Sequence, residues 1–406
     1  MFENLEYLKE KPVAVLGAGA IGKACATDCA LSAQKVNICD MEPFAAKSLF
    51  GADRGINIWG RQRNLYSFER SGTAKMNMIT TSVAEAVKGA GIILICTPAL
   101  GHVPFFKELI PCLEDGQIIH IIPDNYGTLI LRKMMREAGC TKKVIVGGWS
   151  SAPYGCRVET LGGHSFPRVH IEYRAITLRG AALPMTDTDA FLESTKSIGC
   201  FDAITTGNGV AKAETVLDTC FTNVNPMLHV PGTILGVGVM ENWGVIYGNK
   251  YDKFDFSIYS HAFCPSIARM QVAFYEEEIA LAEAIGVGIQ RYEERQFFNR
   301  KSVLAEEFVS KDYEIPFDQQ EYESMGSGPF TIHNRYLTED VPVGCRVYHE
   351  LGKKFNVKTP VIDSMITIAS VFLQKDYFAE GYTLEHLGIA HLDREALLKY
   401  LHEGVI

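Results

Sequence analysis

The feature that most constrains the fold of this chain is a glycine-rich turn between an apolar run and a helical run near its N-terminus. Residues 13–16 (VAVL) lead directly into residues 17–22 (GAGAIG), and the alanine-rich stretch 23–31 follows. In a dinucleotide-binding turn the first glycine permits the tight turn, the second lets a pyrophosphate approach the backbone, and the third lets helix and strand pack closely. The helix N-terminus then faces the phosphates. Packing alone is the alternative reading, and we predict cofactor contacts from Gly17, Ala18, Gly19, Ala20, Ile21 and Gly22.

An acidic residue at the end of the next apolar run indicates which dinucleotide would bind. Asp40 lies 18 positions beyond Gly22, where a carboxylate accepts hydrogen bonds from the adenosine ribose hydroxyls. Glu42 adds a second acid nearby and no arginine is present to bind a 2′-phosphate, so we predict NAD(H), with NADP(H) as the less favoured cofactor. Thr97 and Pro98 follow a later apolar run, at the edge of the sheet where nucleotides lie, and we predict that they line the cofactor. A plain strand-ending turn is the alternative for this pair.

The first half of the chain alternates short apolar runs with helix-like segments. Continuous runs of Val, Ile and Leu bounded by turn residues are typical of parallel strands covered on both faces. These runs occupy residues 13–16, 36–39, 92–96, 118–122 and 144–146. Residues 169–178 alternate more regularly and predict an edge strand or hairpin arm. We therefore expect a Rossmann-like α/β domain over residues 1–208.

The second half has the periodicity of helices. We predict an α-helical substrate and catalytic domain over residues 209–406, with one helix starting at Pro265 or Ser266 and continuing to residue 282. Another helix is expected from Pro360 to about residue 372. The stretch 311–328 is richer in charge, Gly and Pro, which predicts a surface loop.

Composition excludes several classes of function. The 406-residue chain carries a formal net charge of −9 with scattered basic residues, so nucleic acid and acidic membranes are poor partners. The first ten residues lack the basic start and apolar stretch of a secretory signal, and the longest apolar run is too short to span a membrane. Eleven cysteines are dispersed without a CxxC pair. We expect a soluble, cytoplasmic protein.

A nicotinamide enzyme needs a group that gives or takes a proton while hydride moves. His229 stands just beyond Pro226, and Asn225 lies four positions before it on the same prospective helix face. A histidine among apolar residues is more often a satisfied core group, so this reading depends on context. For Arg335, Glu339 and Asp340 the alternative is a solvated charged cluster at a helix start, which is the usual role of such runs.

The context is a resemblance that extends over nearly the whole chain. With the glycine-rich turn, four later segments resemble, in the same order, the octopine/opine dehydrogenase family. They are NPMLH with PG at 225–232, YSHAFCPSIAR at 259–269, RYLTEDVP at 335–342 and GYTLEHLG at 381–388. The resemblance implies a Rossmann-like dinucleotide-binding domain followed by an all-α opine dehydrogenase-type C-terminal domain.

The resemblance also implies an activity and roles for particular residues. Enzymes of this family reductively condense an α-keto acid, often pyruvate, with the amino group of an amino acid. His229 matches the family's catalytic histidine, and Asp340 matches the aspartate paired with it. Arg335 matches an arginine that binds the substrate carboxylate, and Asn225 matches the asparagine that accompanies the histidine. A guanidinium suits that role because its planar fork binds a carboxylate bidentately.

Other assignments stay open at this point. A hydroxyacid, 6-phosphogluconate or glycerol-3-phosphate type of dehydrogenase would use a lysine as proton carrier, and Lys212 is the candidate. A metallophore-forming opine dehydrogenase would generally use NADPH, which Asp40 disfavours. A non-catalytic NAD(H)-sensing protein would be expected to lack His229, Arg335 and Asp340 as a set. We expect no metal site, and a homodimer is compatible with the sequence.

Overall fold

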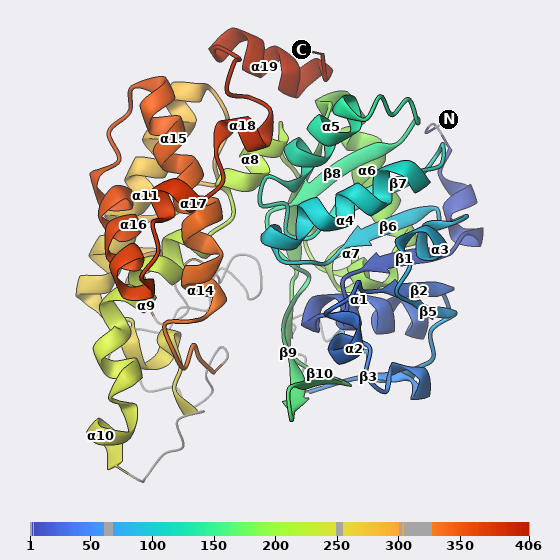
Figure 1. Cartoon of the computed structure of the whole chain (residues 1–406), viewed down its shortest axis with the longest axis horizontal. Helices are drawn as coiled ribbons and strands as arrows, with labels where there is room; N and C mark the ends of the chain where they lie inside the picture. Colours follow the sequence, from blue (N-terminus) through green and yellow to red (C-terminus); the bar gives the residue numbers. More distant parts are fainter. Residues whose placement is uncertain are drawn as a thin grey trace. The chain divides into compact units, whose positions relative to one another are not determined.

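A computed structural model of the protein describes residues 2, 4–60, 68–248, 255–299, 303 and 327–405. The chain divides into two compact units (Figure 1). The first comprises the residues up to Cys220 together with the C-terminal segment from Glu395, and the second comprises described residues between Phe221 and Arg394. The sequence predicts a boundary at residue 208, whereas the compact units of the structure divide between 220 and 221.

The first unit is built on an 8-stranded sheet with the order β12-β11-β8-β7-β6-β1-β2-β5. The six neighbouring strands β5, β2, β1, β6, β7 and β8 pair in parallel. β11 runs antiparallel to β8, and β12 pairs in parallel with β11. Taken along the chain, the parallel part has the strand order of a dinucleotide-binding fold. The strands are β1 (Val13–Leu16), β2 (Val36–Cys39), β5 (Met78–Thr80), β6 (Ile92–Ile95), β7 (Ile118–Ile121), β8 (Ile145–Trp149), β11 (Thr177–Ala182) and β12 (Gly209–Lys212).

The central strands are buried at every position, as the apolar runs predict. β1 lies between β2 and β6, with Val13 opposite Val36 on one side and Ile92 on the other. Burial on both faces of these strands requires helices on both faces of the sheet. The predicted Rossmann-like class is confirmed by this sheet.

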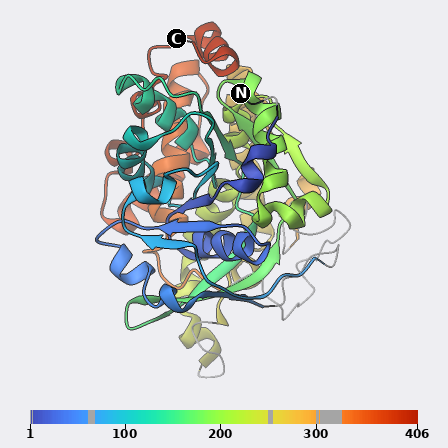
Figure 2. The same cartoon turned by 90° about the vertical axis from the view of Figure 1, so that its right-hand side faces the viewer.

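Short helices connect and cover the strands of the first unit (Figures 1 and 2). α5 packs against β8, and α6 contacts both β8 and β11. The helices are α1 (Ala20–Leu31), α2 (Ala45–Ser48), α3 (Val83–Val87), α4 (His102–Leu109), α5 (Gly127–Glu137), α6 (Thr188–Glu193), α7 (Asp202–Thr206), α8 (Val216–Phe221) and, at the C-terminus, α19 (Arg394–Glu403).

A second sheet of four strands also belongs to the first unit. Its order is β4 (Gly72–Ala74), β3 (Ile56–Trp59), β10 (His164–Arg174) and β9 (Tyr154–Leu161). The run 169–178, expected as one strand, is split between β10 of this sheet and β11 of the large sheet. Buried Asp28 of α1 ties the second sheet in place, since it accepts hydrogen bonds from Arg174, from Arg70 at 3.0 Å and from the Tyr154 hydroxyl at 2.6 Å.

The second unit is helical. α9 is its central element and contacts η10, α11, α14, η12 and α16. The elements are α9 (Asn225–Glu241), α10 (Trp243–Tyr247), the π-helical turn η10 (Ile258–Ala262), α11 (Pro265–Ile285), α12 (Glu294–Phe297), α14 (Arg335–Thr338), the π-helical turn η12 (Asp340–Cys345), α15 (Arg346–Phe355), α16 (Pro360–Leu373), α17 (Tyr377–Glu380) and α18 (Leu384–Leu387).

The helices expected from Pro265 and from Pro360 are confirmed as α11 and α16. Residues 209–212 form a strand, although the sequence predicts helical structure from about residue 209. The expected surface loop at 311–328 lies outside the described residues except for 327 and 328. In the described part of the chain, every helix is too short or too polar to cross a membrane.

Candidate active site

The three glycines of the turn after β1 meet different surroundings. Gly17 has φ of +100°, and a Cβ there would lie 2.7 Å from both the Cys96 carbonyl oxygen and the Thr97 Cγ2 atom. A Cβ at Gly22 would lie 1.8 Å from the Gly17 carbonyl oxygen, whereas one at Gly19 would meet no atom of the described residues within 4 Å. Two glycines are therefore required by packing, and Gly19 leaves free space in front of the first turn of α1.

The Asp40 side chain lies beside this turn and is hydrogen-bonded to its backbone. Its Oδ2 atom accepts hydrogen bonds from the Ala18 backbone N–H at 3.2 Å and from the Ser48 hydroxyl at 2.6 Å. Its Oδ1 atom accepts one from the Met41 backbone N–H at 2.9 Å. A carboxylate oxygen accepts about two hydrogen bonds, so Oδ1 retains capacity for a ribose hydroxyl. Sequence reasoning missed Ser48, which carries no recognisable spacing from Asp40.

Thr97 and Pro98 lie beside the same turn. The Thr97 hydroxyl is buried and has no hydrogen-bond partner among the residues that the structure describes, whereas Pro98 is exposed. A buried hydroxyl without a partner is costly unless a ligand satisfies it. Together with the free space at Gly19, it fits a bound dinucleotide.

In the helical unit, His229 is held by polar contacts at both ring nitrogens. Its Nδ1 atom lies 2.7 Å from Oδ2 of Asp340, and its Nε2 atom lies 2.8 Å from the hydroxyl oxygen of Tyr259. The ring of Tyr336 stacks on the imidazole with centroids 3.6 Å apart and an interplanar angle of 8°. The structure therefore brings together His229 and Asp340, two residues that sequence reasoning selected, and adds two tyrosines.

Local sequence explains how these side chains are positioned. α9 begins with Asn225 and Pro226, and a second proline, Pro231, lies inside the helix, where it cannot donate the usual backbone hydrogen bond. Tyr259 and Asp340 each stand on a π-helical turn. Such turns are rare and are frequent at functional sites, because the extra residue re-aims the side chains of that turn.

Burial controls the electrostatics of the acidic residue. Burial raises the pKa of the Asp340 carboxyl above its ordinary value, and the hydrogen bond from His229 opposes this shift. A carboxylate accepting from Nδ1 selects the tautomer that carries its proton on Nδ1. The Nε2 atom is then the nitrogen that can exchange a proton with another group. The arrangement can therefore perform acid–base chemistry.

Arg335 and Asn225 are near this group without touching His229. The Arg335 side chain is 62% exposed, and its Nε atom is hydrogen-bonded to the buried carboxylate of Glu339. That contact uses Nε, and neither terminal nitrogen is hydrogen-bonded among the residues that the structure describes, which leaves both able to bind a carboxylate. Asn225 is half-buried one helical turn before His229, and no hydrogen bond joins the two side chains in the described ranges. The ion pair of Arg335 with Glu339 belongs to the charged cluster that the sequence suggests at a helix start, but Glu339 and Asp340 are buried rather than solvated.

Sequence reasoning also missed the contacts of Tyr259 and Tyr336 with His229. Both lie inside the segments that carry the family resemblance, at 259–269 and 335–342, but neither has a spacing that points to His229. Their hydroxyl oxygens are 3.5 Å apart. Only the packing of η10 and α14 against α9 reveals the contact.

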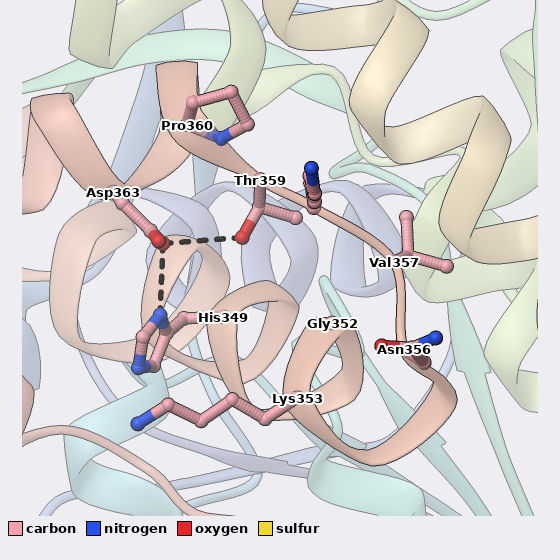
Figure 3. Close-up of a pocket in the computed structure, with 9 residues that line it drawn as sticks. His349, Gly352, Lys353, Asn356, Val357, Thr359, Pro360 and Asp363 are labelled. Carbon is pink, nitrogen blue, oxygen red and sulfur yellow. Dashed lines mark hydrogen bonds and ion pairs between the residues drawn. The ribbon is translucent and has the colours of Figure 1, made fainter.

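A second histidine–aspartate pair lies elsewhere in the helical unit (Figure 3). His349 Nδ1 is 2.8 Å from Oδ1 of Asp363, which also accepts a hydrogen bond from the Thr359 hydroxyl at 3.1 Å. The pair borders a hollow of about 390 Å³ that is lined by none of the predicted site residues. Here the imidazole meets the edge of the Phe378 ring, and no phenol hydroxyl is hydrogen-bonded to it among the described residues. A histidine–aspartate pair alone is therefore not distinctive in this protein.

No metal-binding cluster is present among the described residues, where no three His, Cys, Asp or Glu side chains are grouped to hold an ion.

The chain is similar to known proteins at the levels of family, sequence and structure. Residues 212–373 match the model of the NAD/NADP octopine/nopaline dehydrogenase, alpha-helical domain. The chain is 30% identical to an opine dehydrogenase of Arthrobacter sp. (strain 1C) over 388 residues, which cover 95% of this chain and 97% of that protein. It is 24% identical to the vitopine synthase of Allorhizobium ampelinum, with 93% and 95% covered. The structure is similar to that of octopine dehydrogenase with NADH and pyruvate, with a TM-score of 0.68, 18% identity, and 96% and 98% covered.

Proposed function

The chain belongs to the octopine/opine dehydrogenase family, whose members are NAD(P)-dependent oxidoreductases acting on CH–NH donors, and on that premise we propose that it joins an α-keto acid to an L-amino acid. The reaction uses NADH and gives an N-(carboxyalkyl)amino acid, and the reverse oxidation returns the two substrates. The observation that carries the proposal is the placement of His229 between the Asp340 carboxylate and the Tyr259 hydroxyl.

His229 is the acid–base group of this reaction. The keto acid and the amine form an imine that must be protonated or polarised before hydride attacks its carbon. Asp340 holds the proton on Nδ1 and stabilises the imidazolium, so Nε2 exchanges protons with the reactants. Asn225, one turn earlier on α9, lies on the helix that carries His229 and serves as a substrate-side polar group.

Arg335 binds the carboxylate of the keto acid. Its exposed guanidinium is steadied by Glu339, and the fork of terminal nitrogens orients the reacting carbon. Pyruvate is the keto acid to test first, since octopine dehydrogenase, which has the same fold, was solved with NADH and pyruvate.

Cofactor binding falls to the turn after β1. Residues 17–22, Thr97 and Pro98 receive the pyrophosphate and neighbouring groups, and Asp40 accepts from the adenosine ribose. When bound, the nicotinamide supplies or accepts the hydride. The Asp40 carboxylate repels a 2′-phosphate, which favours NADH over NADPH.

The alternative hydroxyacid-type dehydrogenase is less well supported. Its proton carrier would be Lys212, but this side chain is half exposed on β12 and forms an ion pair with Asp189 at 2.5 Å. This ion pair is a contact on the surface of the first unit, which does not suit a proton carrier. A non-catalytic sensor is opposed by the combined presence of His229, Asp340 and Arg335.

The proposal is tested by following NADH and NADPH absorbance with pyruvate constant and a panel of L-amino acids varied. We expect oxidation that needs both a keto acid and an amino acid and that is faster with NADH. His229→Ala should lower kcat by at least about 100-fold, because it removes the positioned acid–base group.

His349→Ala is the matched control, since it breaks the second histidine–aspartate pair of the same helical unit. Its activity should stay close to that of the parent. Oxidation with the keto acid alone would instead identify a hydroxyacid dehydrogenase, and cofactor binding without turnover across the panel would favour a sensor.

A further inference from the structure

We propose that Tyr259 is a further catalytic residue, whose phenol passes the proton between Nε2 of His229 and the reacting atoms of the substrate. This inference rests on the proposed function, because it needs His229 to act as an acid–base group. It assigns a role to a residue that has none from the motifs or from the comparisons.

The first step of the argument is that both ring nitrogens of His229 already have partners. Nδ1 faces the Asp340 carboxylate at 2.7 Å and carries a proton, since a carboxylate only accepts. Nε2 faces the Tyr259 hydroxyl at 2.8 Å. In the neutral imidazole the phenol donates to Nε2, and in the imidazolium Nε2–H donates to the phenol oxygen. The proton that His229 exchanges is therefore shared with Tyr259.

The second step is that the imidazole is restrained from turning toward another partner. Tyr336 stacks on its face with centroids 3.6 Å apart, and rotation of the ring would break this contact together with both hydrogen bonds. Tyr259 is itself 7% exposed on the π-helical turn η10. Its ring packs edge-to-face with the Phe263 ring, with centroids 5.4 Å apart. Neither ring is free to swing away, so the short path for the proton runs through the phenol oxygen.

The third step is the reaction that this path allows. In the carbinolamine formed from keto acid and amine, the phenolic proton goes to the departing hydroxyl while the carbon–oxygen bond breaks. The nitrogen lone pair forms the carbon–nitrogen double bond, and water leaves. The Nε2 proton of the imidazolium moves to the phenol oxygen at the same time. Tyrosine is thus restored, the positive charge passes to the iminium nitrogen, and His229 ends neutral with its proton on Nδ1.

The test uses Tyr259→Phe, which removes the hydroxyl and keeps the ring. We expect kcat for the condensation to fall by at least about 100-fold, the range for loss of a positioned proton-transfer group, while the NADH KM changes less than about twofold. Tyr377→Phe is the matched control, because it removes a buried hydroxyl of the same unit that has no hydrogen-bond partner in the described ranges.

A measurement on the unaltered protein keeps the inference testable if Tyr259→Phe fails to fold. In mixtures of light and heavy water, two protons moving together give a curved dependence of kcat on the deuterium fraction. We expect a curve for the parent and a straight line for Tyr259→Phe. A straight line for the parent, or kcat of Tyr259→Phe within about threefold of the parent, would overturn the role of Tyr259.

These outcomes are separate from failure of the proposed function. If the parent shows no oxidation of NADH that depends on both substrates, the proposed function fails and the role of Tyr259 falls with it. If the parent is active and His229→Ala is inactive while Tyr259→Phe keeps its activity, only the inference on Tyr259 is wrong.

Discussion

At the residue scale, two buried histidines of this protein are distinguished by the charge of their partners. The His120 ring accepts a hydrogen bond from the Trp149 indole N–H at 3.2 Å and lies 3.0 Å from the Ser194 hydroxyl, both of which are neutral. His229 instead faces the carboxylate of Asp340. His120 is the satisfied core histidine that apolar surroundings usually indicate, whereas His229 has an acidic partner.

The neutral surroundings of His120 predict that acid lowers the free energy of unfolding. Burial lowers the pKa of His120 from 6.5 to about 3, so between these values the unfolded chain binds a proton that the folded chain does not. The stability that the neutral His120 ring contributes is fully present above the pKa of the unfolded chain. It is lost as the pH falls toward the pKa of the folded chain. At about 1.4 kcal/mol per pH unit, acidification from pH 6.5 to 4 should remove about 3 kcal/mol from the free energy of unfolding.

The measurement is urea unfolding at several pH values for the parent, His120→Gln and His402→Gln. We expect His120→Gln to be less stable at neutral pH and to depend less steeply on pH. His402 is exposed, and its variant should follow the parent. Equal slopes for the parent and His120→Gln would show that His120 is not the responsible group.

At the element scale, the glycines of the turn between β1 and α1 meet two different requirements, close packing and open space. Gly17 and Gly22 are dictated by close atoms of the protein itself, whereas Gly19 faces open space. Gly17 and Gly22 therefore serve the stability of the strand–helix junction, and we propose that Gly19 serves ligand approach.

Two alanine substitutions separate these contributions. Gly19→Ala should leave the melting temperature within about 2 °C of the parent and weaken NADH binding by at least about tenfold, because the new methyl group fills the space in front of α1. Gly22→Ala should lower the stability of the first unit by about 2 kcal/mol or more, since its Cβ would overlap the Gly17 carbonyl oxygen.

Thermal melting and fluorescence titration with NADH measure the two effects. Gly139 supplies a control for the loss of a surface glycine, because a Cβ there would meet no atom within 4 Å in the described part of the chain and it is remote from the turn in sequence. Its φ of +62° predicts a small strain in Gly139→Ala and unchanged NADH binding. Unchanged NADH binding in Gly19→Ala would contradict a pyrophosphate contact at that position.

At the scale of the whole molecule, the C-terminal helix belongs to the first unit although the helical unit precedes it in the chain. The segment from Glu395 is part of the same compact unit as the dinucleotide-binding sheet. Leu401 of α19 is fully buried, and the Arg136 guanidinium lies 6.0 Å from the centre of the Tyr400 ring. The two units are therefore not two consecutive pieces of chain.

Loss of this closing contact should destabilise the first unit. Leu401→Ala leaves a cavity in a packed site and should cost about 2–5 kcal/mol. Val405→Ala is the control, since Val405 is 59% exposed. Calorimetry with and without NADH reports the result, and the transition that NADH raises is assigned to the first unit. A lowered melting temperature confined to the transition that NADH leaves unchanged would contradict the placement of α19.

Local patterns in the sequence predict most of the fold and part of the candidate site. Apolar runs and the glycine spacing depend on neighbouring residues, so they are enough to predict β1, β2 and the turn before α1. The spacing of Asp40 from that turn follows from the same βαβ geometry. His229 and Asp340 come instead from the resemblance to a family, because nothing in their local sequence joins residues that are 111 positions apart.

The remaining features depend on tertiary packing. Tyr259 is 30 positions from His229, and it reaches Nε2 only because a π-helical turn aims it toward α9. The division of residues 169–178 between two sheets and the return of α19 to the first unit likewise leave no periodic signal. Periodicity records which face of an element is buried, whereas the partner on that face is selected by how distant elements pack together. The sequence alone therefore determines the α/β fold of the first unit and its dinucleotide turn, and the tertiary structure decides which groups surround the histidine.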